Sequence, residues 1–145
     1  MIVKVSDYRS ALIQGKFLAK KGIWVSEFRI ESGLNCGGHA FATDGYLLGP
    51  VLEEFKMRRQ ELTDHIFAIY NPVILARLGF SLSAPPQMGI SVQGGIGTHE
   101  EDTFLHTYYK VSSTGWGTPF LLVPEATTVD PQTLDLLTAA REEDV

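Results

Sequence analysis

The feature that most constrains the fold is a pattern that recurs four times, in which a short apolar strand is followed by an amphipathic helix. Strands are predicted at Ile2–Val5, Ile23–Glu31, Met88–Gln93 and Val111–Trp116. Helices are predicted from about Tyr8 to Lys21, from Gly49-Pro50 onward, from the Thr98 cap to about Lys110, and from Asp130-Pro131. Strands that alternate with helices form βαβ units, so we predict an α/β fold with a parallel sheet and helices outside it.

Local signals mark several ends of these helices. Asp7 or Ser6 can cap the first helix, and Gly22 can stop it. Thr98 and Glu101 have the spacing of a capping box. Two sets of large apolar residues are expected to form the inner faces of the first and third helices: Leu12, Ile13, Phe17 and Leu18, and Phe104, Leu105 and Tyr108.

The segment Asp64–Gln87 fits this pattern less well, because it is apolar and contains proline. We interpret it as a short helix plus a loop that forms an insertion or lid. The chain of 145 residues is expected to form one domain, 1–145, since a domain of this size buries roughly 68–70% of its unfolded surface.

Charge and hydropathy exclude some classes of partner. The net charge is −5 and no cluster of Lys and Arg is present, which argues against a nucleic-acid surface. The most apolar window, Ile66–Leu82, is interrupted by Asn71, Pro72 and Arg77, so no membrane span is predicted.

The cysteine count and the amino terminus point to a cytoplasmic location. Cys36 is the single cysteine, which precludes an internal disulfide and fits a reducing compartment. The charged residues Lys4, Asp7 and Arg9 argue against a signal peptide. No His-x-x-x-His or paired-carboxylate spacing is present, so no metal site is expected.

A glycine-rich turn after the second predicted strand ends in His39. The carboxyl end of a strand is where α/β proteins usually place their chemistry, so His39 is the candidate catalytic residue. The alternative is a surface or hydrogen-bonded structural histidine.

Two further glycine turns offer phosphate-binding backbone. Gly94–Gly97 lies between a strand and a helix, where unpaired N–H groups and the helix dipole attract anions. Gly115–Thr118 follows the next strand and offers a second set of N–H groups. The acidic run Glu100–Asp102 at the helix start counts against a phosphate, and the first turn can also be a plain strand-to-helix connection.

Three motifs together resemble the nitronate monooxygenases, formerly called 2-nitropropane dioxygenases. Glu31–His39 is similar to their Glu…Ala-Gly-Gly-His segment, and Val92–Ile96 is similar to their Ala-Ala-Gly-Gly-Ile flavin-phosphate loop. Gly115–Phe120 resembles their Met-Gly-Thr-Arg-Phe segment, and Pro124-Glu125 follows at the expected spacing. The motifs occur in the family's order and cover the chain from Ile23 to about Glu125.

The resemblance implies an FMN-dependent (β/α)8 TIM barrel that oxidises a small-molecule nitronate or nitroalkane with O2. It implies that FMN contacts Gly37, Gly38, Gly94, Gly95, Gly115, Trp116, Gly117 and Thr118. It also implies that His39 is the base, since an imidazole titrates near neutral pH and can take a proton from a carbon next to a nitro group. The same motifs occur in FMN-dependent enoyl-thioester reductases, so the two substrate classes stay open.

The chain departs from the family in several ways. Cys36 replaces a small Ala or Ser, and Pro119 replaces an Arg. A full barrel needs about 250 residues, so the resemblance covers the carboxyl-terminal half, and a second chain or an amino-terminal half is expected to complete it. The alternative function is a non-catalytic phosphate-binding α/β module that assembles with another domain.

Overall fold

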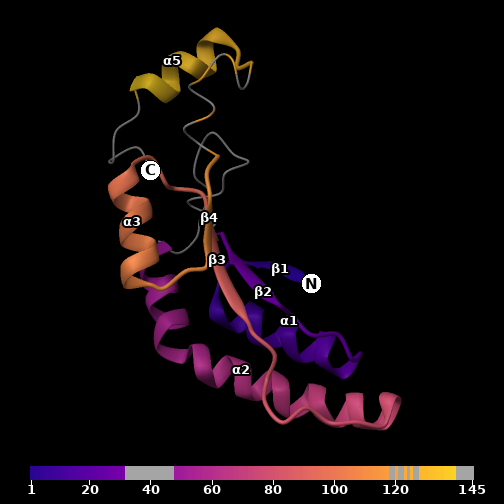
Figure 1. Cartoon of the computed structure of the whole chain (residues 1–145). Helices are drawn as coiled ribbons and strands as arrows, with labels where there is room; N and C mark the ends of the chain where they lie inside the picture. Colours follow the sequence, from indigo (N-terminus) through magenta and orange to yellow (C-terminus); the bar gives the residue numbers. More distant parts are fainter. Residues whose placement is uncertain (32–47, 118–119, 121–122, 124, 126–127, 140–145) are drawn as a thin grey trace.

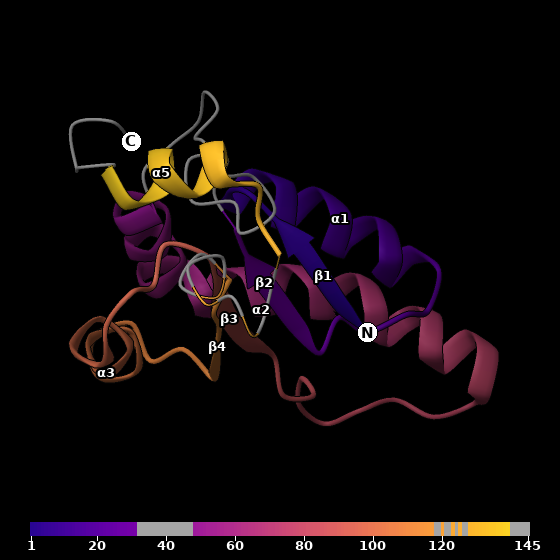
Figure 2. The ribbon, with the colours of Figure 1, turned by 90° about the horizontal axis from the view of Figure 1, so that it is seen from above.

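The computed structural model describes residues 1–31, 48–117, 120, 123, 125 and 128–139. Its strands are β1 (Ile2–Val5), β2 (Glu27–Ile30), β3 (Gly89–Gln93) and β4 (Ser113–Gly115). They form one sheet in the order β1-β2-β3-β4, and all three pairings are parallel (Figures 1 and 2). The predicted α/β fold with a parallel sheet is therefore confirmed, although β2 and β4 are shorter than the sequence suggested.

The strand register divides the sheet into two chemically different faces. Phe28 and Ile30 of β2 align with Ile90 and Val92 of β3, and these side chains are buried. We call this side the covered face. Residues at the alternating positions point to the opposite side, which we call the open face: Lys4, Glu27, Arg29, Ser91, Gln93 and Ser113.

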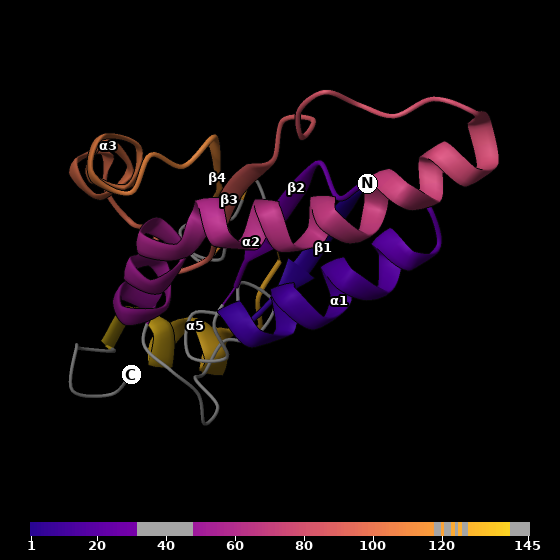
Figure 3. The same cartoon turned by 90° about the horizontal axis from the view of Figure 1, so that it is seen from below.

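Two helices, α1 (Tyr8–Lys20) and α2 (Leu48–Leu78), lie side by side on the covered face (Figure 3). In α1 the buried residues are mostly small, Ala11, Gly15 and Ala19, at a spacing of four. A Cβ on Gly15 would overlap Ile66 Cδ1, so glycine is what permits this close approach. The expected inner face of α1 is wrong in part, because Ile13 and Phe17 are exposed.

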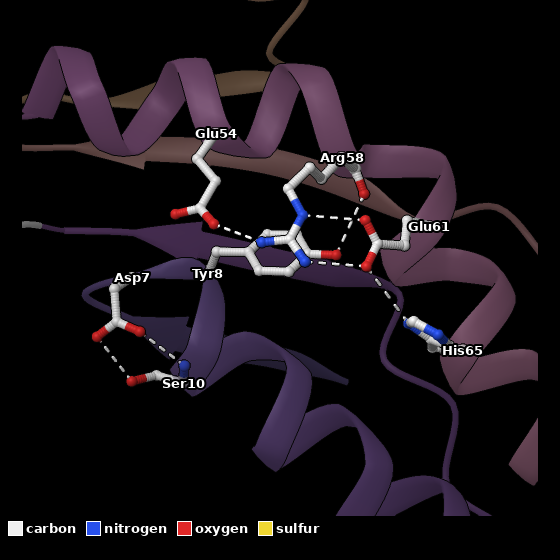
Figure 4. Close-up of polar contacts among 7 residues, drawn as sticks. All are labelled: Asp7, Tyr8, Ser10, Glu54, Arg58, Glu61 and His65. Carbon is white, nitrogen blue, oxygen red and sulfur yellow. Dashed lines mark hydrogen bonds and ion pairs between the residues drawn. The ribbon is translucent and has the colours of Figure 1, made fainter.

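Polar side chains join α1 to α2 at the rim of this core (Figure 4). The Arg58 guanidinium donates to Glu54 at 2.6 Å and to both oxygens of Glu61 at 2.9 Å. It also lies 4.0 Å from the centre of the Tyr8 ring, and the Tyr8 hydroxyl donates to the Arg58 carbonyl. Asp7 caps α1, as predicted, by accepting a hydrogen bond from Ser10 N–H at 2.7 Å.

The segment 64–87 differs from the expected short helix plus loop. Its first part is the second half of α2, which continues through Pro72 to Leu78. The chain then returns to β3, and Leu82 is held against the helix by two hydrogen bonds with the Asn71 side chain. Figure 1 shows this end of α2 at the side of the sheet away from the carboxyl ends of the strands. The segment therefore does not cover the glycine turns Gly94–Gly97 and Gly115–Gly117.

Helices α3 (His99–Tyr108) and α5 (Pro131–Ala139) complete the described elements. α3 lies outside β4, and α5 lies beyond the carboxyl ends of the strands (Figures 1 and 2). The predicted capping box of Thr98 and Glu101 is confirmed. Of the three residues expected on the inner face of α3, Leu105 is buried, whereas Phe104 and Tyr108 are exposed and stack on each other.

Candidate functional site

The sequence-predicted site residues divide into those the structure describes and those it does not. His39, Gly37, Gly38 and Thr118 lie outside the described residues. The structure describes Gly94 and Gly95, which follow β3, Gly115, which ends β4, and Trp116 and Gly117, which follow β4, all at the carboxyl edge of the sheet. The described site therefore consists of two glycine corners.

The first corner, Gly94–Gly95, turns the chain out of β3. Both residues have positive φ, 86° and 66°, which favours glycine because a Cβ is strained there. Gly94 N–H donates to Gly115 C=O at 3.1 Å, so this amide is used within the protein. Gly94 is buried, Gly95 is exposed, and the described residues accept no hydrogen bond from Gly95 N–H.

The second corner, Gly115–Gly117, lies directly beside the first because of that hydrogen bond. A Cβ on Gly115 would lie 3.2 Å from Gln93 Cγ, so the absence of a side chain lets the two strand ends stay close. Trp116 is 38% exposed and is therefore not a core residue. The structure thus brings together two corners that are separated by 20 positions in the sequence, from Gly95 to Gly115.

The amino terminus of α3 is largely occupied by the protein itself. Glu101 Oε2 accepts hydrogen bonds from Gly97 N–H at 2.7 Å and from Thr98 N–H at 2.9 Å. Glu101 N–H in turn donates to Thr98 Oγ1. Because a carboxylate already occupies this helix end, an anion at the site would bind at the glycine corners and not on the axis of α3.

The acidic run at the start of α3 has separate structural roles. Asp102 accepts a hydrogen bond from Thr114 Oγ1 at 2.6 Å, and this bond lowers the pKa of the Asp102 carboxyl. Glu101 belongs to the capping box, and Glu100 is exposed. The sequence pattern alone did not reveal the contact of Asp102 with β4.

Charged residues on the open face were also missed by sequence reasoning. Lys4 Nζ lies 2.7 Å from Glu31 Oε2, and the Glu31 side chain is only 3% exposed. Arg29 pairs with Glu27 at 3.5 Å, and Ser91 Oγ donates to Glu27. The signal was present as charged residues at every second position of the strand sequence Glu27–Glu31.

Two other classes of feature are absent from the part of the chain that the structure describes. No described helix has the length and apolarity required to cross a membrane. Within the same residues, no group of three or more His, Cys, Asp and Glu side chains could hold a metal ion.

Three comparisons with known proteins gave no match to this chain. No protein-family model matches the chain, and neither a curated protein nor a solved structure gives a significant match.

Proposed function

We propose that this chain is the carboxyl-terminal half of an FMN-dependent (β/α)8-barrel oxidoreductase of the nitronate monooxygenase type. The observation that carries this proposal is the hydrogen bond from Gly94 N–H to Gly115 C=O, which joins two glycine corners at the carboxyl edge of a parallel sheet. Consecutive late strands of a barrel build phosphate sites at this position.

The strand order and the open face support the half-barrel part of the proposal. Parallel strands in sequential order, connected through helices on one face, match a segment of a barrel wall. Parallel sheets are normally covered on both faces, yet the Lys4 and Arg29 side chains on the open face are exposed. A second chain or an amino-terminal half would cover this face and close the barrel.

Two of the described glycines fit the binding of a phosphoryl group through their backbone amides. Gly95 is exposed, and its N–H and that of Gly117 have no hydrogen-bond acceptor among the described residues. Gly94 shapes the turn but does not offer its N–H to a phosphate, because that N–H already donates to Gly115 C=O. The family resemblance alone assigns four further residues to the FMN site: Gly37, Gly38, Trp116 and Thr118.

In the proposed reaction His39 takes a proton from the carbon next to the nitro group of a small-molecule substrate. FMN held at the glycine corners would accept the electron pair of the substrate, with O2 as the final oxidant. The imidazole is suited to the proton transfer because its pKa lies near neutral. A cytoplasmic location fits the single cysteine.

Flavin binding tests the cofactor assignment directly. The purified chain should be yellow or should become yellow with FMN, and Gly95→Val should abolish this binding. Gly79→Val is the matched control, because Gly79 also has positive φ, 78°, but lies at the end of α2 with no atom within 4 Å of the place a Cβ would take. Equal loss in both variants would mean that backbone strain, and not the corner, is responsible.

Turnover assays then test the catalytic residue and the substrate class. His39→Ala should retain FMN and lose turnover, and unchanged turnover would remove His39 from the reaction. Activity with nitronates and O2 supports the favoured reaction, whereas reduction of enoyl thioesters supports the reductase alternative.

The closed amino terminus of α3 favours the second candidate, a non-catalytic module that assembles with another domain. Glu101 already accepts the first N–H groups that a phosphate would use. A colourless protein that takes up no FMN, even with a partner domain present, would support this module.

A further inference from the structure

We infer that Asp102 is a positioning residue that holds the second glycine corner, Gly115–Gly117, beside the first, Gly94–Gly95. The FMN part of this inference rests on the proposed function. The positioning part stands on contacts between α3 and β4 and can be tested without a ligand.

The residue before Gly115 is bonded to the neighbouring helix. Thr114 Oγ1 donates to Asp102 Oδ1 at 2.6 Å. The acceptor is a carboxylate, and hydrogen bonds to an ionised acceptor are stronger than those between neutral groups. The strand end that carries Gly115 is therefore tied to α3 by an acidic group.

The alternation of a strand explains why this arrangement fixes Gly115. Thr114 aligns with Val92 on the covered face, where α3 lies, whereas Gly115 aligns with Gln93 on the open face. Anchoring Thr114 restrains the peptide group that joins it to Gly115. The Gly115 carbonyl, which accepts from Gly94 N–H, is part of that anchored backbone.

The carboxylate is itself well placed. Asp102 lies in the first turn of α3, where the helix dipole favours negative charge, and its side chain is 24% exposed. His106 Nε2 lies 3.8 Å from Asp102 Oδ1, and His106 Nδ1 lies 3.1 Å from Val111 C=O. His106 thus spans α3 and the segment that leads into β4.

The test is hydrogen exchange and indole NMR on the wild-type chain and on Asp102→Asn. The amide in place of the carboxylate weakens the charge-assisted hydrogen bond from Thr114, so Gly94 N–H should exchange roughly tenfold faster. Gly89 N–H, which donates to Ser26 C=O at the other end of β3, should exchange at its wild-type rate. Unchanged exchange at Gly94 would overturn the inference.

The two tryptophans provide an internal reference for the same experiment. The Trp116 indole signal should shift in Asp102→Asn, whereas the Trp24 indole, which donates to Gln87 C=O at 3.2 Å, should not. Thr114→Val should reproduce the faster exchange of Gly94, and Thr114→Ser, which keeps the hydroxyl, should restore it. Glu100→Gln is the matched control, because it removes an exposed acid from the same helical turn.

FMN titration separates this inference from the proposed function. If the wild-type chain binds FMN, Asp102→Asn should weaken binding roughly tenfold, the lower end of the range seen when groups that orient ligand contacts are removed from metal sites. If Asp102→Asn speeds the exchange of Gly94 N–H but binds FMN with wild-type affinity, the FMN part of the inference is overturned. If the wild type binds no FMN, the proposed function fails, and the exchange and indole measurements still decide whether Asp102 positions the corner.

Discussion

The two faces of the sheet are made from the same strands but carry opposite chemistry. On the covered face, Phe28, Ile30 and Val92 are fully buried beneath α1 and α2. On the open face, Arg29 lies one residue from Phe28, is 41% exposed, and pairs with Glu27 at 3.5 Å. A single residue step in β2 thus separates an apolar core position from a solvated ion pair.

This contrast shows which part of the fold the chain can stabilise alone. The covered face buries aromatic and aliphatic surface, which is the dominant favourable contribution to folding. On the open face the ion pair of Arg29 with Glu27 is partly exposed, and pairs of this kind typically add little stability. We therefore expect substitutions on the covered face to change the free energy of unfolding and those on the open face to change assembly.

The largest effect is expected for Phe28→Ala. The Phe28 side chain is fully buried, and its removal should lower the free energy of unfolding by about 3–5 kcal/mol through lost burial and a residual cavity. Urea unfolding followed by circular dichroism measures this change. A loss below about 1 kcal/mol would mean that α1 and α2 do not cover this face in solution.

A smaller loss is expected for Gly15→Ala, which adds a methyl group to the same core. The new Cβ would overlap Ile66 Cδ1 and lie 3.2 Å from Phe28 Cζ, so the core must shift, at a cost of about 1–3 kcal/mol. Gly49→Ala is the control, because the atom nearest to its added Cβ, Tyr109 Oη, is 3.9 Å away. That variant should be neutral or slightly stabilising, and a common loss in both would argue against close packing at Gly15.

The Asp7 cap of α1 contributes to the stability of the fold in a way that depends on pH. Burial alone would raise the pKa of Asp7, but hydrogen bonds from Ser10 N–H and from the Ser10 and Ser6 hydroxyls lower it below its ordinary 3.8. The cap therefore contributes stability above pH 3.8, and this is lost as the pH falls through the lower folded-state pKa.

Asp7→Ala should cost about 1 kcal/mol at neutral pH. The difference between wild type and variant should shrink as the pH falls from about 4 through the lower folded-state pKa of Asp7, where the carboxyl of the folded protein becomes protonated. Thermal unfolding at neutral pH and in acid near pH ~3 measures both values. A difference that grows in acid would contradict the assigned sign.

The smallest effect on the isolated chain is expected for Arg29→Ala on the open face. The ion pair with Glu27 is partly exposed, so its removal should change the free energy of unfolding by less than about 1 kcal/mol. If a second barrel half covers this face, the same variant should weaken that association in sedimentation measurements. A stability loss as large as that of Phe28→Ala would remove the distinction between the faces.

Local signals predicted the elements well, whereas the inner faces of the helices were less predictable. The capping box of Thr98 and Glu101 and the cap at Asp7 were found because each involves residues three positions apart. The prediction for the inner face of α1 is wrong in part because large apolar side chains were expected there. The close approach of Ile66 instead requires glycine at position 15. The length of α2 was not predicted, because a proline-containing segment favours a short helix plus a loop, whereas the structure continues the helix through Pro72 to Leu78.

The candidate site was predictable as a set of turns but not as an arrangement. Residue types were enough to place glycine turns after β3 and β4, since positive φ at Gly94 and Gly95 is a local requirement. They did not reveal that Gly94 N–H donates to Gly115 C=O or that Asp102 accepts a hydrogen bond from Thr114. Contacts of this kind depend on strand register and helix placement, which are set by packing between segments far apart in the chain.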